Sequence, residues 1–292
     1  MTSLGKALAA LAAGALALVA AGAASGAPRA AAASCGKSDL SLVNSGTLTI
    51  GTDNPAYPPW YAGGSPKGSK WKINDPSTGK GFESAVAYAV AKQLGFSKAE
   101  VSWTYVPFNR AFAPGKKPFD FDINQISFTP ARAKVVTFSS SYYDVNQAVV
   151  VVKGTKIASV KSVAGLQPFK LGAQLGTTSY QFITSQIKPS QQPAVYPQNA
   201  GAVQALKNHQ IDGLVVDLPT AFYVTAVQVP NSTILGQFPT KAGGEHFGMV
   251  FGKGNPLATC VDGAIKKLRS SGALKKIQHA WLAKATGAPI LK

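Results

Sequence analysis

Acidic residues are scarce in this 292-residue chain, where 12 aspartates and glutamates stand against 29 lysines and arginines and leave a formal charge of +17. Removing residues 1–34, which contain Lys6 and Arg29, lowers that charge only to +15. The lysines are spread along the chain and are not gathered on one helix between aromatic residues, which argues against nucleic-acid binding. We therefore expect a solvated basic surface that attracts anionic lipid headgroups or wall polymers.

Histidine is rarer still, with His209, His246 and His279 far apart in the sequence. None has a nearby pattern of serine, aspartate or cysteine that would complete a catalytic triad or a metal site. The sequence therefore gives no reason to expect a metal or another cofactor.

Long apolar runs are missing from the chain except at its start, where Lys6 precedes the small-apolar run from Ala7 to Ala24. This order is typical of a secretory signal, and we assign residues 1–34 to it. Without a further apolar segment long enough to span a bilayer, we expect a soluble protein that is periplasmic or extracellular at the cell surface.

Only two cysteines are present, Cys35 directly after the signal region and Cys260 near the far end. Cys35 follows the small residues of a lipobox, so acylation is one reading, although the usual leucine is missing and Pro28 and Arg29 interrupt the apolar run. A disulfide to Cys260 is favoured, because disulfides persist outside the cell. Two free thiols are the third reading, and in an exported protein they would be reactive.

Alternating strand and helix patterns predict an α/β protein. The predicted strands and helices up to the midpoint are a strand at 47–51, a helix at 82–94 closed by Gly95, and a strand at 101–106. A second set follows, with strands at 169–173 and 211–216 and helices from 180, at 200–209 and at 219–227. Between 53 and 81 lies a long loop rich in proline, glycine and lysine, and long loops of this kind are often functional.

Two apolar segments, 147–153 and 245–252, are long enough to cross between two domains. The closing segment 260–283 is helical, and Gly272 divides it into two helices. We therefore expect a first lobe formed by residues 35–146 and 241–292, and a second lobe formed by residues 147–240.

Several short motifs occur in a defined order along the chain. They are Gly51-Thr52-Asp53, Tyr57-Pro58-Pro59-Trp60, Gly81-Phe82-Glu83, Ser127 to Arg132, Phe138 to Tyr143, Gln174 to Thr178, Val215-Val216-Asp217, and Phe247-Gly248 with Lys253-Gly254-Asn255. This ordered set, spanning about residues 46 to 283, resembles the polar-amino-acid branch of the solute-binding proteins of ABC transporters. The resemblance implies the two-lobed periplasmic-binding-protein type II fold with two crossover hinge strands. It also implies a monomer that delivers an amino acid to an ABC permease.

A free amino acid offers a carboxylate, an ammonium and a side chain, so its site needs a cation, an anion and a selective pocket. Arg132 can bind the α-carboxylate through two parallel hydrogen bonds, although an isolated arginine is more often part of a surface ion pair. Asp217 follows a buried strand and suits the α-ammonium, although the cap of the following helix is an equal alternative. Asp53 also ends a strand and suits the ammonium or the ligand side chain.

The remaining candidates complete this pocket. Aromatic walls are expected from Tyr57, Trp60 and Phe108, hydrogen bonds from Ser127, Gln174 and the carbonyl of Gln125, and anion-binding N–H groups from Gly176, Thr177 and Thr178. These assignments carry over from the family only where the motifs match.

The sequence also departs from the family's pattern. Asp53 and Tyr57 are four apart where many relatives have three, Thr178 replaces a glycine found in some relatives, and the loop 63–80 is enlarged and basic. Arg110 is an extra cation near Phe108 that could bind an acidic side chain, although a solvated arginine is the plainer reading. We expect a basic or neutral polar ligand before an acidic one.

Two other functions are compatible with this fold. An enzyme such as a cyclohexadienyl-dehydratase-like lyase would need a general acid in the cleft, for which Glu83 is the main candidate besides the isolated histidines. An extracellular sensor domain would need a membrane span or a signalling segment, and none follows Lys292. We therefore expect a binding protein without catalytic residues.

Overall fold

The computed structural model describes residues 35–238, 244–285 and 287–292. The predicted signal segment, residues 1–34, and the expected domain boundary at 240/241 lie outside these ranges. Among the described residues, no helix combines the length and the apolar character that crossing a membrane requires. The expected domain bounds stay a prediction.

The first lobe contains a five-stranded sheet in the order β2-β1-β3-β12-β4. Its strands are β1 (Leu48–Thr52), β2 (Val101–Tyr105), β3 (Phe121–Asp122), β4 (Val136–Phe138) and β12 (Val250–Gly252). β1 runs parallel to β2 and β3, whereas β12 pairs antiparallel with β3 and β4 and returns from the far end of the chain. This sheet therefore combines strands from the first half of the chain with one strand from near its C-terminus.

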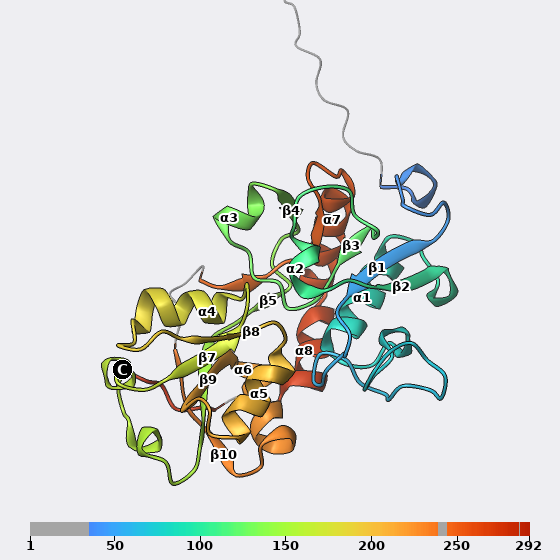
Figure 1. The fold of residues 1–292 in the computed structure, drawn as a ribbon. Coiled ribbons are helices and arrows are strands. Elements are labelled where there is room, and N and C mark those ends of the chain that lie inside the picture. Colours follow the sequence, from blue (N-terminus) through green and yellow to red (C-terminus); the bar gives the residue numbers. More distant parts are fainter. Residues whose placement is uncertain (1–34, 239–243, 286) are drawn as a thin grey trace, which may run out of the picture. The chain divides into compact units, whose positions relative to one another are not determined.

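Helices α1 (Phe82–Gln93), α7 (Leu257–Ser270) and α8 (Ala273–Leu282) contact one another in the first lobe (Figure 1). The apolar face of α1 is buried in a core that it shares with β1 and α7. Gly272 separates α7 from α8 with a φ of 72°, a left-handed conformation that glycine adopts without steric cost. The predicted division of the closing helical segment at this glycine is confirmed.

The second lobe contains a five-stranded sheet in the order β10-β6-β9-β7-β8. Its strands are β6 (Gln147–Val152), β7 (Leu171–Gln174), β8 (Ala194–Tyr196), β9 (Gly213–Asp217) and β10 (Ser232–Phe238). Every residue of β6 is buried, as expected for an apolar strand covered on both faces. Helix α5 (Asn199–Lys207) packs beside β7 and β9, and α6 (Leu218–Tyr223) packs beside β6 and β9 (Figure 1). Helix α4 (Thr178–Phe182) follows β7.

The segments that link the two sheets differ from the sequence expectation. β6, expected to cross between the lobes, lies wholly within the second sheet. One chain segment leads from the first sheet into the second, and another returns from β10 to the first sheet. These two segments pair with each other as a two-stranded ribbon of β5 (Tyr143–Asp144) and β11 (His246–Phe247). The predicted strand 245–252 is accordingly divided into β11 and β12, because its two halves pair with different partners.

Short helical elements complete the fold. They are the helices α2 (Phe108–Ala111) and α3 (Pro130–Ala133), the π-helical turns Ile183–Ile187 and Val224–Gln228 after α4 and α6, and the 3₁₀ turns Lys37–Asp39, Pro76–Thr78, Lys98–Glu100, Lys156–Ser159 and Ala164–Leu166.

A disulfide joins Cys35 to Cys260 of α7, with their Cα atoms 5.4 Å apart. It connects the start of the described chain to the first lobe across a sequence separation of 225 residues. Of the three readings of these cysteines, the structure shows the disulfide.

Candidate functional site

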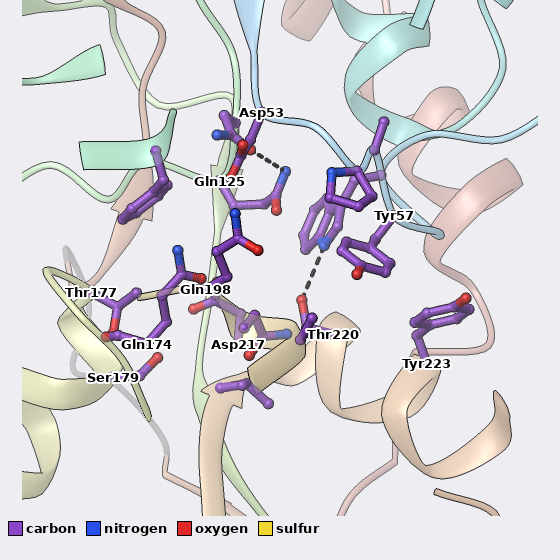
Figure 2. Close-up of a pocket in the computed structure, with 18 of the residues that line it drawn as sticks. Asp53, Tyr57, Gln125, Gln174, Thr177, Ser179, Gln198, Asp217, Thr220 and Tyr223 are labelled. Carbon is purple, nitrogen blue, oxygen red and sulfur yellow. Dashed lines mark hydrogen bonds between the residues drawn. The ribbon is translucent and has the colours of Figure 1, made fainter. Parts of the chain in front are cut away.

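A cavity of about 110 Å³ is lined by residues of both lobes. Figure 2 shows Asp53, Tyr57 and Gln125 of the first lobe opposite Gln174, Asp217 and Thr220 of the second. Ten of the twelve candidate binding residues line it, namely Asp53, Tyr57, Trp60, Phe108, Gln125, Arg132, Gln174, Thr177, Thr178 and Asp217. Segments as distant in sequence as 53 and 217 thus meet at one place.

The guanidinium of Arg132 already makes two hydrogen bonds to backbone carbonyls. Its Nη1 donates to the carbonyl of Ser127 at 2.6 Å, and its Nη2 donates to the carbonyl of Gly176 at 2.8 Å. The guanidinium carbon lies 4.2 Å from the centre of the Phe112 ring and 5.8 Å from that of Phe108. Only 7% of the residue is exposed, and burial lowers the pKa of Arg132 to about 10, so it stays protonated at neutral pH.

The guanidinium has five N–H donors in one plane, and two of its nitrogens are fixed by the carbonyl contacts. Its other donors are available to an anion in the cavity that Arg132 lines. Since the two carbonyl partners belong to different lobes, Arg132 also links the lobes.

Asp217 is the last residue of β9 and immediately precedes α6. Its side chain makes no cap hydrogen bond to that helix and instead accepts one from Nε2 of Gln147 at 2.8 Å. Burial, and secondarily the charge of Glu245, raises the pKa of Asp217 well above its usual range. The cap interpretation is therefore wrong for the side chain, and Asp217 is a half-buried acid at the edge of the cavity.

Gln125 adopts a φ of 49°, which is uncommon for a residue other than glycine. Glu83 stabilises this backbone, since one of its carboxylate oxygens accepts the Gln125 N–H at 2.6 Å and the other accepts the Gln125 side-chain amide. The hydroxyl of Tyr142 donates to the same carboxylate. Glu83 is fully buried behind the cavity and does not line it, so its suggested place as a cleft acid is wrong.

Burial dominates the titration of Glu83. It raises the pKa of this carboxyl to about 7, and hydrogen bonds from Tyr142 and Gln125 oppose the shift.

Asp53 follows β1 directly and accepts a hydrogen bond from the Asn54 N–H at 2.7 Å. Burial raises its pKa to about 6, because the backbone hydrogen bonds only partly offset the loss of solvation. Tyr57 lies near Tyr223 with 6.2 Å between ring centres, and Trp60 Nε1 donates to Oγ1 of Thr220 at 3.1 Å. An acid and aromatic side chains therefore line the same cavity.

Two candidate residues, Ser127 and Gly176, do not line the cavity. Their carbonyls hold Arg132, and the Ser127 hydroxyl lies 3.3 Å from that of Thr178 and donates to Glu245. The hydroxyl of Thr177 caps α4 by accepting the Tyr180 N–H at 3.1 Å. Arg110 is exposed and, like the three histidines, lies outside the cavity lining.

Polar residues that the motifs did not identify also line the cavity, including Asn124, Gln198, Asn199 and Tyr223. Within the described residues, Nδ2 of Asn124 and Oδ1 of Asn199 are buried without a hydrogen-bond partner. Buried polar atoms are rarely left unpaired, so both are suited to a polar ligand. No local pattern marks Asn199, which reaches the cavity only through the packing of α5.

The sequence model of the bacterial extracellular solute-binding proteins, family 3, matches residues 48–284. The ABC transporter glutamine-binding protein GlnH of Bacillus subtilis (strain 168) is 28% identical over 215 residues, which cover 72% of this chain and 76% of that protein. The ABC transporter arginine-binding protein 1 of Escherichia coli (strain K12) is 29% identical over 209 residues, covering 69% of this chain and 81% of that protein.

Solved structures agree with the two-lobed arrangement. An ancestral arginine-binding protein bound to glutamine superposes with a TM-score of 0.66 at 29% identity, covering 81% of this chain and 97% of that one. The ancestral amino acid-binding protein AncCDT-1, described as a precursor of cyclohexadienyl dehydratase, gives 0.64 at 27% identity, covering 81% and 95%.

Proposed function

Because this chain belongs to the bacterial extracellular solute-binding proteins of family 3, we propose that it captures one free polar amino acid and presents it to an ABC permease. The observation that carries the proposal is the meeting of Arg132 and Asp217 from different lobes at one cavity. The guanidinium suits an α-carboxylate, and the aspartate suits an α-ammonium. A zwitterion that fills the cavity would then join both lobes.

The charges at the cavity favour a basic or neutral polar ligand over an acidic one. Arg132, Asp217 and Asp53 are the ionisable acids and bases among its described lining residues, apart from tyrosines. Once the first two hold the α-groups, Asp53 is left to face the ligand side chain, beside Tyr57 and the unpaired amide of Asn124. A cation or an amide can donate to Asp53, whereas a second carboxylate would be repelled.

Calorimetric titration against the twenty amino acids, with product analysis of the same samples, tests this proposal. We expect one or a few basic or neutral polar amino acids to bind with a Kd on the order of micromolar or tighter, without turnover. Replacing Arg132 by lysine should weaken that binding on the order of a hundredfold, because lysine keeps the charge but cannot reproduce the paired hydrogen bonds of the guanidinium. The matched control is Arg110→Lys, which changes an exposed arginine outside the cavity. Absence of binding by all twenty would overturn the proposal.

The enzyme alternative has its own outcome in this experiment. Asp53, with a pKa of about 6, is an acid at the cavity that can donate a proton near neutral pH. Conversion of a prephenate-like or arogenate-like acid that disappears in Asp53→Asn would identify a dehydratase in place of a carrier.

Export, a monomeric state and a permease partner belong to the same proposal. Mass analysis of the mature N-terminus tests export, with cleavage expected near residue 34. Size-exclusion chromatography of the mature chain tests the monomeric state. Stimulation of the ATPase activity of the cognate permease by the ligand-loaded protein tests the third.

A further inference from the structure

Glu245 is a carboxylate at the site that the sequence motifs did not mark. It immediately precedes β11, on the connection that returns from the second lobe to the first. One of its oxygens accepts a hydrogen bond from Oγ of Ser127 at 2.5 Å, and the other accepts one from Nε2 of Gln147 at 3.0 Å. Since Ser127 belongs to the first lobe and Gln147 begins β6 of the second, this carboxylate contacts both lobes beside the cavity.

Gln147 places Glu245 next to Asp217. The same Nε2 atom donates to Oδ1 of Asp217 at 2.8 Å, so one amide nitrogen holds both carboxylates. The amide cannot turn freely, because its Oε1 accepts from the hydroxyl of Ser179 at 2.7 Å and the residue is only 1% exposed. One amide nitrogen therefore holds two acids, Asp217 in the cavity lining and Glu245 next to it outside that lining.

This acidic pair has too few cations of its own. The charged and titratable groups facing it are Arg132 from α3, Glu83 from α1 and Tyr143 from β5. The Nη1 and Nη2 atoms of Arg132 donate to backbone carbonyls of Ser127 and Gly176, not to either carboxylate. Within the described residues the pair shares one amide and one hydroxyl donor. The repulsion between two carboxylates at this separation is relieved either by a proton, which the raised pKa of Asp217 favours, or by a bound cation.

A primary ammonium meets this requirement. It carries three N–H donors and one positive charge, so it can donate to Asp217 and to Glu245 at once. The contact would also connect the ligand to the segment that carries the hinge ribbon β5–β11.

We propose that Glu245 is a second carboxylate of the α-ammonium subsite, paired with Asp217 through the shared amide of Gln147. The inference rests on the proposed function, since it assigns the ammonium end of the same ligand. It makes the site selective for amino acids over the corresponding 2-hydroxy acids, whose hydroxyl carries no charge and one donor.

The test compares wild type and Glu245→Gln with three pairs of probes: L-arginine, L-glutamine and L-histidine, each against its 2-hydroxy acid analogue. The carboxamide has nearly the same shape as the carboxylate and can still bond to Ser127 and Gln147, so the change removes mainly the charge. We expect Glu245→Gln to bind the amino acid at least roughly tenfold more weakly and to bind the hydroxy acid within about threefold of wild type. Asp144→Asn, a carboxylate on β5 that is exposed and outside the cavity lining, is the matched control and should change neither affinity.

The other outcomes distinguish failure of the proposed function from failure of the role assigned to Glu245. A wild type that binds none of the twenty amino acids overturns the proposed function and this inference with it. A wild type that binds, with an unchanged amino-acid affinity in Glu245→Gln, overturns this inference alone, and so does an equal loss for amino and hydroxy acids, which indicates a purely structural residue. If the variant does not fold, a crystal structure of the wild-type complex decides: the ammonium nitrogen should lie within about 3.2 Å of Glu245, and a larger separation contradicts the proposal.

Discussion

The burial of Asp53 should make ligand affinity depend on pH. Its pKa of about 6 means that the carboxyl is mostly neutral at pH 5 and mostly ionised at pH 7. A cationic ligand side chain binds the ionised form, so affinity for arginine should rise about tenfold between these pH values. Titration calorimetry at pH 5, 6 and 7 measures the change, and Asp53→Asn should flatten it. Parallel pH profiles in wild type and variant would exclude this role.

The residue scale is also where sequence reasoning succeeds and fails most clearly. The position of Arg132, Asp217 and Asp53 at one cavity could be predicted because strand ends and an ordered motif mark them. Glu245 and Asn199 could not, because their places depend on the packing of segments far apart in the sequence. The sequence predicts that Ser127 hydrogen-bonds to the ligand, and in the structure its carbonyl accepts from Arg132 and its hydroxyl donates to Glu245.

Helix α1 contributes to the site through a buried acid. The pKa of Glu83, raised to about 7 by burial, exceeds the usual value of 4.5, so the folded protein holds a proton that the unfolded chain releases between these values. Stability should therefore fall as pH rises from 5 to 8, by up to about 3 kcal/mol relative to Glu83→Gln. Urea unfolding of both proteins at several pH values measures the difference.

A second glutamate provides the control for this prediction. Glu100 in the turn Lys98–Glu100 is half-buried, and its pKa is lowered to about 2 by the hydrogen bond from Lys37 and by those from Ser97. Its contribution is present above pH 4.5 and is lost only as pH falls toward 2, so Glu100→Gln should run parallel to wild type between pH 5 and 8. An equal slope for Glu83→Gln and wild type would contradict the role of Glu83.

Helix α7 carries the disulfide to Cys35, which should stabilise the protein mainly by restricting the unfolded chain. For a loop of 225 residues the entropic model gives about 5 kcal/mol. The double variant Cys35→Ser/Cys260→Ser should therefore unfold at a markedly lower denaturant concentration than wild type, and reduction of wild type should reproduce the shift. Unchanged midpoints, or an acyl group on Cys35 in the mature protein, would contradict the stabilising bridge.

The elements themselves were predicted well where one helix or strand has one environment, as for α1, α7 and α8. The predicted strand 245–252 is an exception, because alternation along the sequence indicates extended backbone but does not reveal its pairing partners. In the structure β11 pairs with β5 in one sheet, and β12 pairs with β3 and β4 in another. Pairing partners are a property of the assembled fold.

At the scale of the whole molecule, hydrogen bonds between the lobes at or beside the cavity include those of Trp60 with Thr220, Arg132 with Gly176, and Ser127 with Thr178. If the ligand stabilises closure, adding the amino acid that binds should lower the radius of gyration in small-angle X-ray scattering. Trp60→Phe removes one of these hydrogen bonds and should weaken binding modestly, by about 1 kcal/mol. An unchanged scattering curve at saturation would argue against hinge closure.

The most direct measurement is a crystal structure of the protein with its bound amino acid. The account predicts the α-carboxylate within hydrogen-bond distance of the Arg132 guanidinium and the ammonium within that distance of Asp217. An amino acid that binds elsewhere, or that leaves either of these side chains without contact, would contradict it.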